Sequence, residues 1–364
     1  MNPFHHRFTS RVLRLAFLWT MGNSPRVPNP SENERILLGE LLRQVSRTFY
    51  RTLRALPASV RTQISLAYLL ARTTDTIADT EIIPPSERLA ALQRLRARIL
   101  GRSSVPLDFG ELARQQGSPA ERVLLDRIED SLNLLDQLAT PDLELVRSVL
   151  DTITGGQELD LQRFGQVSSS TIVALQSEAE LEDYTFRVAG CVGEFWTRIC
   201  RAHVFPHARM DEARLVAEGI RFGKGLQLVN ILRDLPGDLR KGRCYLPETE
   251  LAEVGLRPAD LLESGREATL RPLYDRYLAS AASHLAVGWT YTNSLPWRNA
   301  RVRLACAWPV LIGVRTLARL RTENPLDPAR PIKISRAEVR GILWRSVLLY
   351  PIPPLWRLQA PLAA

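Results

Sequence analysis

Apolar residues recur every three to four positions along most of the chain, which is the spacing that places them on one face of an α-helix. The period is clearest in four segments: ERILLGELLRQVSRTFYRTL (34–53), PSERLAALQRLRARILG (85–101), ERVLLDRIEDSLNLLDQL (121–138) and LELVRSVLDTITGGQEL (143–159). The alternating patterns typical of half-buried strands are almost absent. The pattern therefore predicts a single all-α domain of roughly ten or more helices.

The two ends of the chain differ from this pattern. FTSRVLRLAFLWTMG (8–22) places basic residues before an apolar run that is too short to span a bilayer. ILWRSVLLYPIPPLW (342–356) is apolar but is interrupted by an arginine and three prolines, and is typical of a segment that packs on the core or lies at a membrane surface. We expect an N-terminal extension over 1–30, the main domain over 31–345 and an apolar C-terminal tail over 346–364.

Composition narrows the possible partners. The 364 residues are 45% hydrophobic and 24% charged, which is ordinary for a protein with a sizeable core. The net charge of +9 suits an anionic partner, such as nucleic acid, an acidic membrane surface or a phosphorylated substrate. Cys191, Cys200, Cys244 and Cys306 form no Cys-x-x-Cys pair, so neither a zinc site nor a disulfide framework is expected. A cytoplasmic location fits best, with peripheral contact at the inner face of the cell membrane left open.

An acidic stretch interrupts one of the apolar helical segments. In ISLAYLLARTTDTIADTE (64–81), Asp75 and Asp79 lie one turn apart on one helix face. Like charges at this spacing repel each other. Solvent, a basic partner or a metal ion must therefore offset the repulsion.

A second acidic stretch has the same spacing. In LQLVNILRDLPGDLRKGRCYLP (226–247), Asn230, Asp234 and Asp238 follow one another at four-residue intervals, and basic residues follow them. Magnesium prefers hard oxygen ligands and often links one or two carboxylates to substrate phosphates. Spacing alone leaves two interpretations open: a magnesium–diphosphate clamp built from both stretches, or solvated helix faces with local ion pairs.

Several stretches resemble, in order, the signatures of the squalene/phytoene synthase family, the head-to-head prenyl synthases. They are SRTFY (46–50), YLLARTTD (68–75), DTIAD (75–79), DYTFRVAGCVGEFW (183–196) and NILRDLPGDLRKGRCYLP (230–247). The last is the most specific because it is long and distinctive. The resemblance covers most of the chain. It implies an all-helical isoprenoid-synthase fold around a single deep apolar central cavity, with the two acidic helix faces at its mouth.

The resemblance also implies roles for the acidic residues. Asp75 and Asp79 are expected to bind Mg²⁺ for one diphosphate, and Asp234 and Asp238 for the other, with Asn230 assisting on the second helix. These aspartates count as catalytic because an allylic diphosphate ionises only when the charge of its leaving group is neutralised. The carbocation that remains must be kept from water, so a dry apolar cavity fits the chemistry.

Further roles follow from the same resemblance. Tyr184 matches a central tyrosine of the family linked to proton removal or cation steering, although a phenol is a poor base at neutral pH. Its alternative role is that of a buried tyrosine with a satisfied hydroxyl. Gly190 and Gly193 are expected to let two helices approach closely. The residues expected to contact the substrate are Ser46, Arg47, Phe49, Tyr68, Arg72, Gln227, Arg233 and Arg243.

One local feature complicates the second acidic face. Asp234 and Asp238 are separated by Leu-Pro-Gly. Proline removes a helical hydrogen bond, and the residue before it resists the helical conformation. We expect the helix either to kink at Pro236 or to end there, with Asp238 delivered by a turn.

Rival functions differ in visible features. A chain-elongating prenyltransferase or terpene cyclase is expected to carry a D-D-x-x-D motif, which neither acidic stretch has. A nucleic-acid-binding helical protein is expected to cluster Lys and Arg with exposed aromatic residues, and a non-catalytic assembly factor to have lost several of the acids. We therefore expect an enzyme with no nucleic-acid partner, and its oligomeric state is left open.

The product is the last inference from sequence. RPIKISRAEV (330–339) resembles a lysine-bearing stretch associated with the reductant in squalene synthases, so Lys333 is the candidate contact for an NADPH phosphate, with a surface lysine as the alternative. The implied reaction is that of a squalene synthase: two farnesyl diphosphates are condensed to presqualene diphosphate, which NADPH reduces to squalene. A non-reductive dehydrosqualene or phytoene synthase is the alternative. The chain has no dinucleotide fingerprint, so NADPH is expected to bind in the helical cavity.

Overall fold

The computed structural model describes residues 31–46, 49–165, 167 and 171–360. As the periodicity predicts, the described chain is helical almost throughout. Its β-structure is limited to a short parallel pair, β1 (Val173–Ala174) with β2 (Arg243–Cys244). The all-α prediction is therefore confirmed. The described ranges contain no helix with the length and apolarity needed to cross a bilayer.

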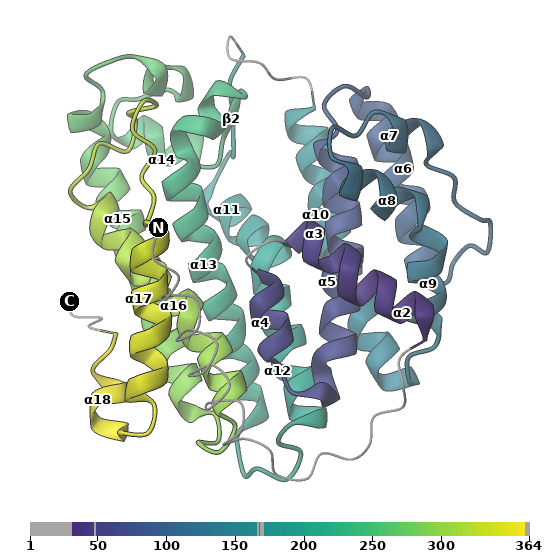
Figure 1. Cartoon of the computed structure of the whole chain (residues 1–364). Coiled ribbons are helices and arrows are strands. Elements are labelled where there is room, and N and C mark those ends of the chain that lie inside the picture. Colours follow the sequence, from purple (N-terminus) through teal and green to yellow (C-terminus); the bar gives the residue numbers. More distant parts are fainter. Residues whose placement is uncertain (1–30, 47–48, 166, 168–170, 361–364) are drawn as a thin grey trace, which may run out of the picture.

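The N-terminal part of the chain supplies the helices drawn from purple to blue-teal in Figure 1. They are α2 (Glu32–Arg35), the π-helical turn η1 (Ile36–Leu41), α3 (Leu42–Ser46), α4 (Phe49–Ala55), α5 (Ala58–Asp79), α6 (Pro85–Ile99), α7 (Gly110–Arg114), α8 (Pro119–Asp126), α9 (Ile128–Asp136) and α10 (Thr140–Phe164).

The C-terminal part follows β1 and is drawn from teal to yellow. Its helices are α11 (Glu178–Thr185), the π-helical turn η2 (Phe186–Gly190), α12 (Cys191–His203), α13 (Glu212–Arg240), α14 (Glu248–Glu253), the 3₁₀ turn η3 (Pro258–Leu262), α15 (Glu267–Ser294), α16 (Ala300–Leu320), α17 (Arg336–Leu349) and α18 (Pro353–Arg357).

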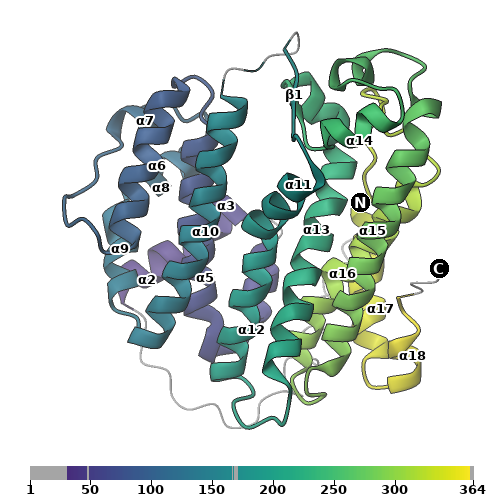
Figure 2. The same cartoon turned by 180° about the vertical axis from the view of Figure 1, so that it is seen from behind.

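Helix α13 occupies the centre of the molecule. It packs against α12, α15 and α16, while α5 packs on α10, and α10 packs on α12. Figures 1 and 2 show α5 and α10 on one side of α12, with α13 and α15 on the other. The apolar faces predicted from the three-to-four spacing form the two buried clusters of the core. The two acidic stretches thus belong to helices on opposite sides of α12.

The chain segments around α12 and α13 approach each other at glycines. A Cβ atom added to Gly193 would lie 2.0 Å from the carbonyl oxygen of Gly219, and one added to Gly223 would lie 2.1 Å from that of Ala189. Only glycine permits these approaches, because real side chains never come so close to a backbone oxygen. The packing role expected for Gly193 is what the structure shows.

The end of the chain packs on the core. Trp356 of α18 is fully buried, stacks on Trp289 with ring centroids 5.3 Å apart, and donates from Nε1 to Asn293 Oδ1 at 2.8 Å. The guanidinium carbon of buried Arg303 lies 5.7 Å from the centroid of the Trp356 ring. The domain boundary expected after residue 345 falls inside α17, and the N-terminal extension over 1–30 lies outside the described residues. The division into extension, domain and tail remains a prediction.

Candidate active site

The first acidic face forms the last two turns of α5. Arg72 donates from Nη1 to Asp75 Oδ2 at 2.5 Å and from Nη2 to Glu121 Oε1 of α8 at 2.5 Å. Burial, and next the charge of Asp79, raise the pKa of Asp75 to about 6 against the opposing charge of Arg72. Asp79 itself is exposed. Tyr68, two turns earlier on α5, interacts with both Arg72 and Asp75. The repulsion expected from the spacing is thus present and only partly offset.

The second acidic face belongs to α13, which continues as a helix past Pro236. The expectation that the helix might end there is wrong, and Asp238 shares a helix face with Asn230 and Asp234. Arg233 forms a forked pair with Asp234, with N–O distances of 2.8 and 2.5 Å. Burial, followed by the charge of Asp234, raises the pKa of Asp238 to about 6.

Arg243 connects the two faces. It lies in β2, just after α13, and is held in register with Val173 of β1. Its charge interacts with Asp79 of α5 and Asp160 of α10, and with Asp238 of α13. Carboxylates from three helices therefore lie within electrostatic range of one guanidinium. The two acidic faces, far apart in sequence, both act on Arg243.

Arg88 of α6 joins this cluster and was not among the residues predicted from the sequence. Its side chain is buried, and Nη1 donates to the carbonyl oxygen of Ala78 at 2.6 Å. Burial, and next the positive charge of Arg243, lower the pKa of Arg88. The negative charge of Asp79 opposes this shift. Helix α6 contains several arginines. Nothing in the local sequence distinguishes Arg88 from the others.

Tyr184 lies in the last turn of α11 and faces the second acidic helix. Its ring stacks on that of Tyr245, with centroids 4.6 Å and planes 26° apart. Its hydroxyl interacts with Tyr245 and with the amide of Gln227, which accepts from Asn230 Nδ2 at 3.4 Å. Burial raises the pKa of Tyr184 above that of an ordinary phenol. Tyr184 and Gln227 are thus brought together, but the phenol is no base by itself at neutral pH.

Two further residues near Tyr184 escaped the sequence analysis. Tyr245 donates from Oη to Asp160 Oδ2 at 3.1 Å. Burial raises the pKa of Asp160 to about 6. Tyr245 stands inside the distinctive GRCYLP run, which was a usable signal. Asp160 has none, because its partner lies 85 residues away.

Other residues predicted to contact the substrate are less informative. Ser46 ends α3 and is buried, and its hydroxyl donates to the carbonyl oxygen of Leu42 at 2.5 Å. Arg47 lies outside the described residues. Phe49 is the first residue of α4, but the structure does not describe its side chain. Their assignment to the substrate remains a prediction.

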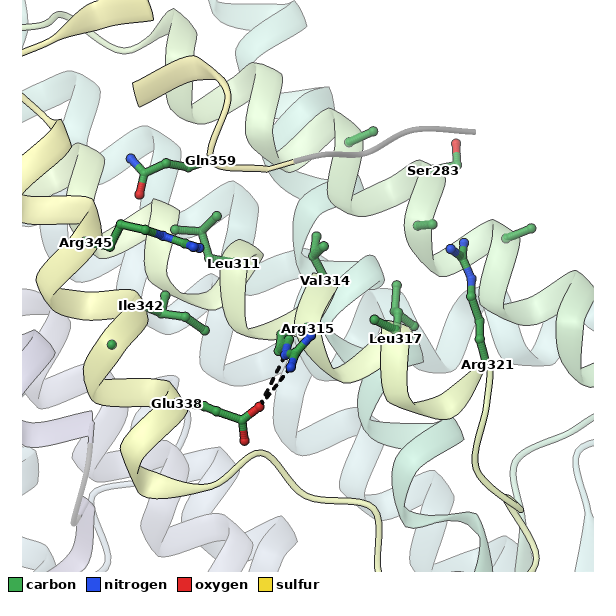
Figure 3. A pocket seen from close by; sticks show the side chains of 15 residues that line it. Ser283, Leu311, Val314, Arg315, Leu317, Arg321, Glu338, Ile342, Arg345 and Gln359 are labelled. Atoms are coloured by element: carbon green, nitrogen blue, oxygen red, sulfur yellow. Dashed lines mark hydrogen bonds and ion pairs between the residues drawn. The ribbon is translucent and has the colours of Figure 1, made fainter. Parts of the chain in front are cut away.

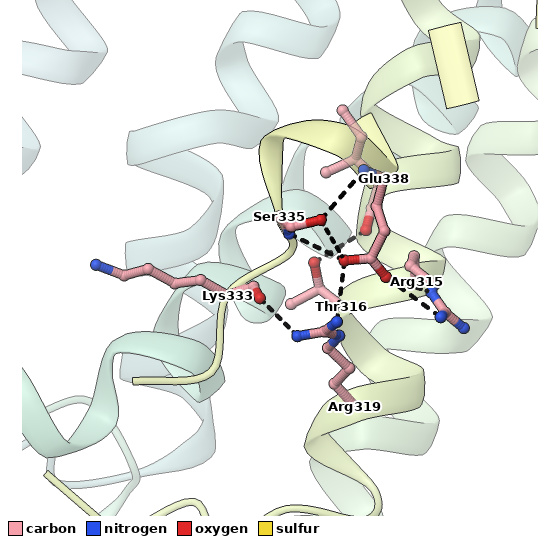
Figure 4. A network of polar contacts seen from close by, with 7 residues as sticks. Arg315, Thr316, Arg319, Lys333, Ser335 and Glu338 are labelled. Atoms are coloured by element: carbon pink, nitrogen blue, oxygen red, sulfur yellow. Dashed lines mark hydrogen bonds and ion pairs between the residues drawn. The ribbon is translucent and has the colours of Figure 1, made fainter. Parts of the chain in front are cut away.

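Lys333 lies in the exposed segment between α16 and α17. Its carbonyl oxygen accepts from Arg319 Nη1 at 2.7 Å, and both Arg315 and Arg319 pair with Glu338. Figure 4 shows the side chain of Lys333 directed away from this network. The network fixes the backbone of the segment and leaves the ammonium group exposed. Its role toward NADPH remains a prediction.

A groove of about 780 Å³ lies between α15, α16 and α17. Figure 3 shows Arg315, Arg321 and Arg345 around it, with Glu338 paired to Arg315. None of the described residues that the sequence predicted as site residues lines this groove. It is therefore separate from the acidic faces.

The acidic faces fit a magnesium–diphosphate site rather than a ready-made metal cage. Among the described residues, no three His, Cys, Asp or Glu side chains form a cluster that could hold a metal by themselves, and the cysteines are buried and free. Each face instead offers a pair of carboxylates. Magnesium bound in that way keeps several waters and completes its shell with substrate phosphates. The hard oxygen donors suit it better than a softer metal.

Comparisons with known proteins identify the family. The family model for squalene/phytoene synthase matches residues 42–338. Presqualene diphosphate synthase of Rhodopseudomonas palustris is 28% identical over 329 residues, which cover 88% of this chain and 98% of that protein. A bifunctional lycopene cyclase/phytoene synthase of Colletotrichum graminicola is 27% identical over 76% of this chain, and the match spans 44% of that longer protein. The ligand-bound structure of TcSQS superposes with a TM-score of 0.72 at 20% identity, over 89% of both chains, and shows the shared fold.

Proposed function

Because the chain belongs to the squalene/phytoene synthase family, we propose that it joins two farnesyl diphosphates head to head into presqualene diphosphate and reduces this product to squalene with NADPH. One observation supports the condensation: the presqualene diphosphate synthase of Rhodopseudomonas palustris aligns with this chain over almost its whole length. The paired acidic faces suit that chemistry. The enzyme would then be a prenyl-transferring squalene synthase (farnesyl-diphosphate farnesyltransferase) of isoprenoid biosynthesis, supplying sterol or hopanoid formation.

The acidic faces would hold the two diphosphates. Asp75 and Asp79 receive one, and Asp234 and Asp238 the other, through Mg²⁺, which when bound neutralises the charge that develops on the leaving group. Burial, and next the repulsion by a neighbouring carboxylate, raise the pKa values of Asp75 and Asp238. A cation held between the two carboxylates of a pair would remove their repulsion. The repulsion in the unliganded protein therefore favours binding of the cation. Arg243, placed between the faces, is positioned to contact phosphate oxygens.

Arg72 and Arg233 would act as exchangeable partners. In the free protein each holds one aspartate, Asp75 and Asp234 respectively, at 2.5 Å. With the carboxylate engaged by a metal, Arg233 would be free of its ion pair, and Arg72 would keep only its pair with Glu121 at 2.5 Å. Each guanidinium would then have N–H groups to donate to the diphosphate. The pairs seen in the structure thus hold the arginines near the place where the leaving group forms.

The reductive step rests on Lys333. An ammonium group could hold a phosphate of NADPH as a point charge, and NADPH when bound would supply the hydride. Phytoene synthase activity is the second candidate, because the similar proteins include bifunctional enzymes with that activity. Release of dehydrosqualene would follow if the final cation lost a proton instead of gaining a hydride.

We extend the proposal to a membrane surface as a partner. No Asp or Glu occurs from 339 to 364, and Arg345 and Arg357 are exposed there. Buried Trp356 anchors the segment that presents the exposed apolar side chains. An apolar patch with basic residues around it suits an anionic lipid surface. The exposed apolar side chains of this segment are Leu348, Ile352, Leu355 and Leu358.

Vesicle co-sedimentation tests the membrane proposal. The protein should sediment with vesicles that contain phosphatidylglycerol and remain free of purely phosphatidylcholine vesicles. Replacing Leu355 and Leu358 together by glutamate should abolish binding. Val105→Glu, at an equally exposed apolar side chain elsewhere, is the matched control and should keep it. Binding that survives the double replacement would remove this surface from the proposal.

Product analysis tests the enzymatic proposal. Purified protein with farnesyl diphosphate and Mg²⁺ should form presqualene diphosphate, and adding NADPH should convert it to squalene, as followed by chromatography with mass detection. Identical dehydrosqualene with and without NADPH would refute the reductive step and leave the condensation intact. Turnover of geranylgeranyl diphosphate alone would replace the proposal by phytoene synthesis.

A further inference from the structure

A chain of polar side chains leads away from Tyr184. The ring of Tyr184 stacks on Tyr245, and their hydroxyls interact. The hydroxyl of Tyr245 donates onward to Asp160 Oδ2 at 3.1 Å. These groups come from α11, from the segment after β2 and from α10. The family resemblance links Tyr184 to proton removal or cation steering, whereas Tyr245 and Asp160 have no role in the proposed function.

We propose that Asp160 is the final acceptor of the proton released in the condensation, and that Tyr184 and Tyr245 pass the proton to it. The inference rests on the proposed head-to-head condensation and names the base that this reaction needs. It also explains how a phenol that is a poor base can take part in removing a proton.

The proton transfer balances without forming a phenolate. When the cyclopropane ring closes, a C–H bond of one substrate breaks, and its electron pair forms a carbon–carbon bond of the ring. The proton goes to the oxygen of Tyr184 as the proton of Tyr184 passes to Tyr245 and that of Tyr245 to Asp160. Both phenols end neutral, and the carboxylate ends as a carboxylic acid. The diphosphate released in the same step is the base that later restores the carboxylate.

The surroundings of Asp160 suit this role. Its Oδ1 atom is buried and accepts no hydrogen bond from the described residues, and Arg163 Nη1 lies 4.0 Å from it. The charges that act on Asp160 are those of Arg163, Arg243 and Asp238. Burial outweighs the two arginines and raises its pKa to about 6. The group is thus ionised at neutral pH, yet binds a proton more readily than an exposed aspartate.

The experiment compares Asp160→Asn with the wild type, using farnesyl diphosphate and Mg²⁺ without NADPH. Formation of presqualene diphosphate should slow by about 100-fold, the lower end of general base catalysis, with the KM little changed. Substrate deuterated at the carbon that loses the proton should then show a primary isotope effect larger than in the wild type, because proton transfer limits the rate. Tyr245→Phe should give the same two changes, and Asp160→Glu should restore part of the rate.

Asp151→Asn is the matched control. Asp151 lies on the same helix, and its carboxylate pairs with Arg96 at 2.6 Å. Its removal should leave both the rate and the isotope effect as in the wild type. Thermal unfolding followed by circular dichroism shows whether each variant folds.

The outcomes separate the inference from the proposed function. Wild-type rates for Asp160→Asn would overturn the proton path, and so would a folded but slow variant without an enlarged isotope effect, because that result describes a structural role. A wild-type protein that converts no prenyl diphosphate would overturn the proposed function itself.

Discussion

The hydroxyl of Tyr274 in α15 donates to the carbonyl oxygen of Leu232 in α13 at 3.0 Å, in a buried contact between two central helices. Leu232 lies four residues before Pro236, so the backbone N–H from which its carbonyl would normally accept is missing. Tyr274 supplies the missing donor from a neighbouring helix. This contact accounts for the continuation of α13 through Pro236, which keeps Asp238 on the same helix face as Asp234.

We predict that Tyr274→Phe lowers the free energy of unfolding by about 1–3 kcal/mol, because it leaves a buried carbonyl without a donor. Turnover should also fall, since the helix that carries Asp234 loses its support at the proline. Urea unfolding and product formation measure the two effects. Tyr277→Phe is the control: its hydroxyl donates to exposed Glu178 at 2.8 Å, which water can solvate. Equal losses in both variants would contradict the special role of Tyr274.

The close approach of α12 and α13 gives a second prediction. Gly193→Ala should lower the free energy of unfolding by about 3 kcal/mol or more, because its Cβ would lie 2.0 Å from the carbonyl oxygen of Gly219. Gly341→Ala, also in a helix but with no atom within 4 Å of the added Cβ, should stabilise by up to about 1 kcal/mol. Thermal melts of both variants check the contrast. Similar shifts in the melting temperature would show that the helices can move apart at little cost.

What the sequence could predict depends on how far apart the interacting residues lie. The spacing of Asp75 and Asp79 is local, because residues four apart share a helix face whatever the rest of the fold does. Gly193 was a reasonable candidate for helix packing on the same grounds. Long-range partners leave no such trace. Asp160 is one acid among several on α10, and only the fold brings Tyr245 to it.

Pro236 shows how a local rule fails for a physical reason. Proline does remove the hydrogen bond that would close the turn, so an interruption of the helix was a sound expectation. The cost is met by a donor 42 residues away on another helix. The side chain of Tyr274 carries no mark in the sequence that assigns it to Leu232. A single sequence therefore predicts the hydrogen bond lost at Pro236 but not the hydrogen bond from Tyr274 that replaces it.

The reductive half of the proposed reaction is tested at Lys333. We predict that Lys333→Ala raises the apparent KM for NADPH by about tenfold, the effect of losing roughly 1.4 kcal/mol of binding, with the condensation unchanged. Steady-state rates of squalene formation at varied NADPH measure it. Lys241→Ala, a second exposed lysine, is a useful comparison, because it lies beside the second acidic face and should affect diphosphate binding instead. A KM for NADPH equal to that of the wild type would show that Lys333 is a surface lysine with no role in NADPH binding.

The last prediction concerns Asp75, where function and stability oppose each other. Its carboxyl has a pKa of about 6 in the folded protein, against 3.8 for an ordinary aspartate. The folded state thus binds this proton more tightly than the unfolded state does. The stabilisation from this group is complete below pH 3.8 and is lost as the pH rises through 6. Above that pH the ionised Asp75 carries the strain of burial and of the repulsion by Asp79.

Asp75→Asn removes the charge and keeps the shape. In metal-free protein above pH 6 the variant should melt at a higher temperature than the wild type, and the difference should vanish near pH 4, where the wild-type carboxyl is protonated. Adding Mg²⁺ with a diphosphate should stabilise the wild type more than the variant, because the variant keeps only the second acidic pair, Asp234 and Asp238, complete. Turnover should fall by on the order of 10²–10³ or more in the variant, and wild-type turnover should decline below pH 6 as the carboxylate protonates. A variant that is both fully active and no more stable than the wild type would show that Asp75 is a solvated surface acid, because a metal-binding carboxylate held against its neighbour cannot give that pair of results.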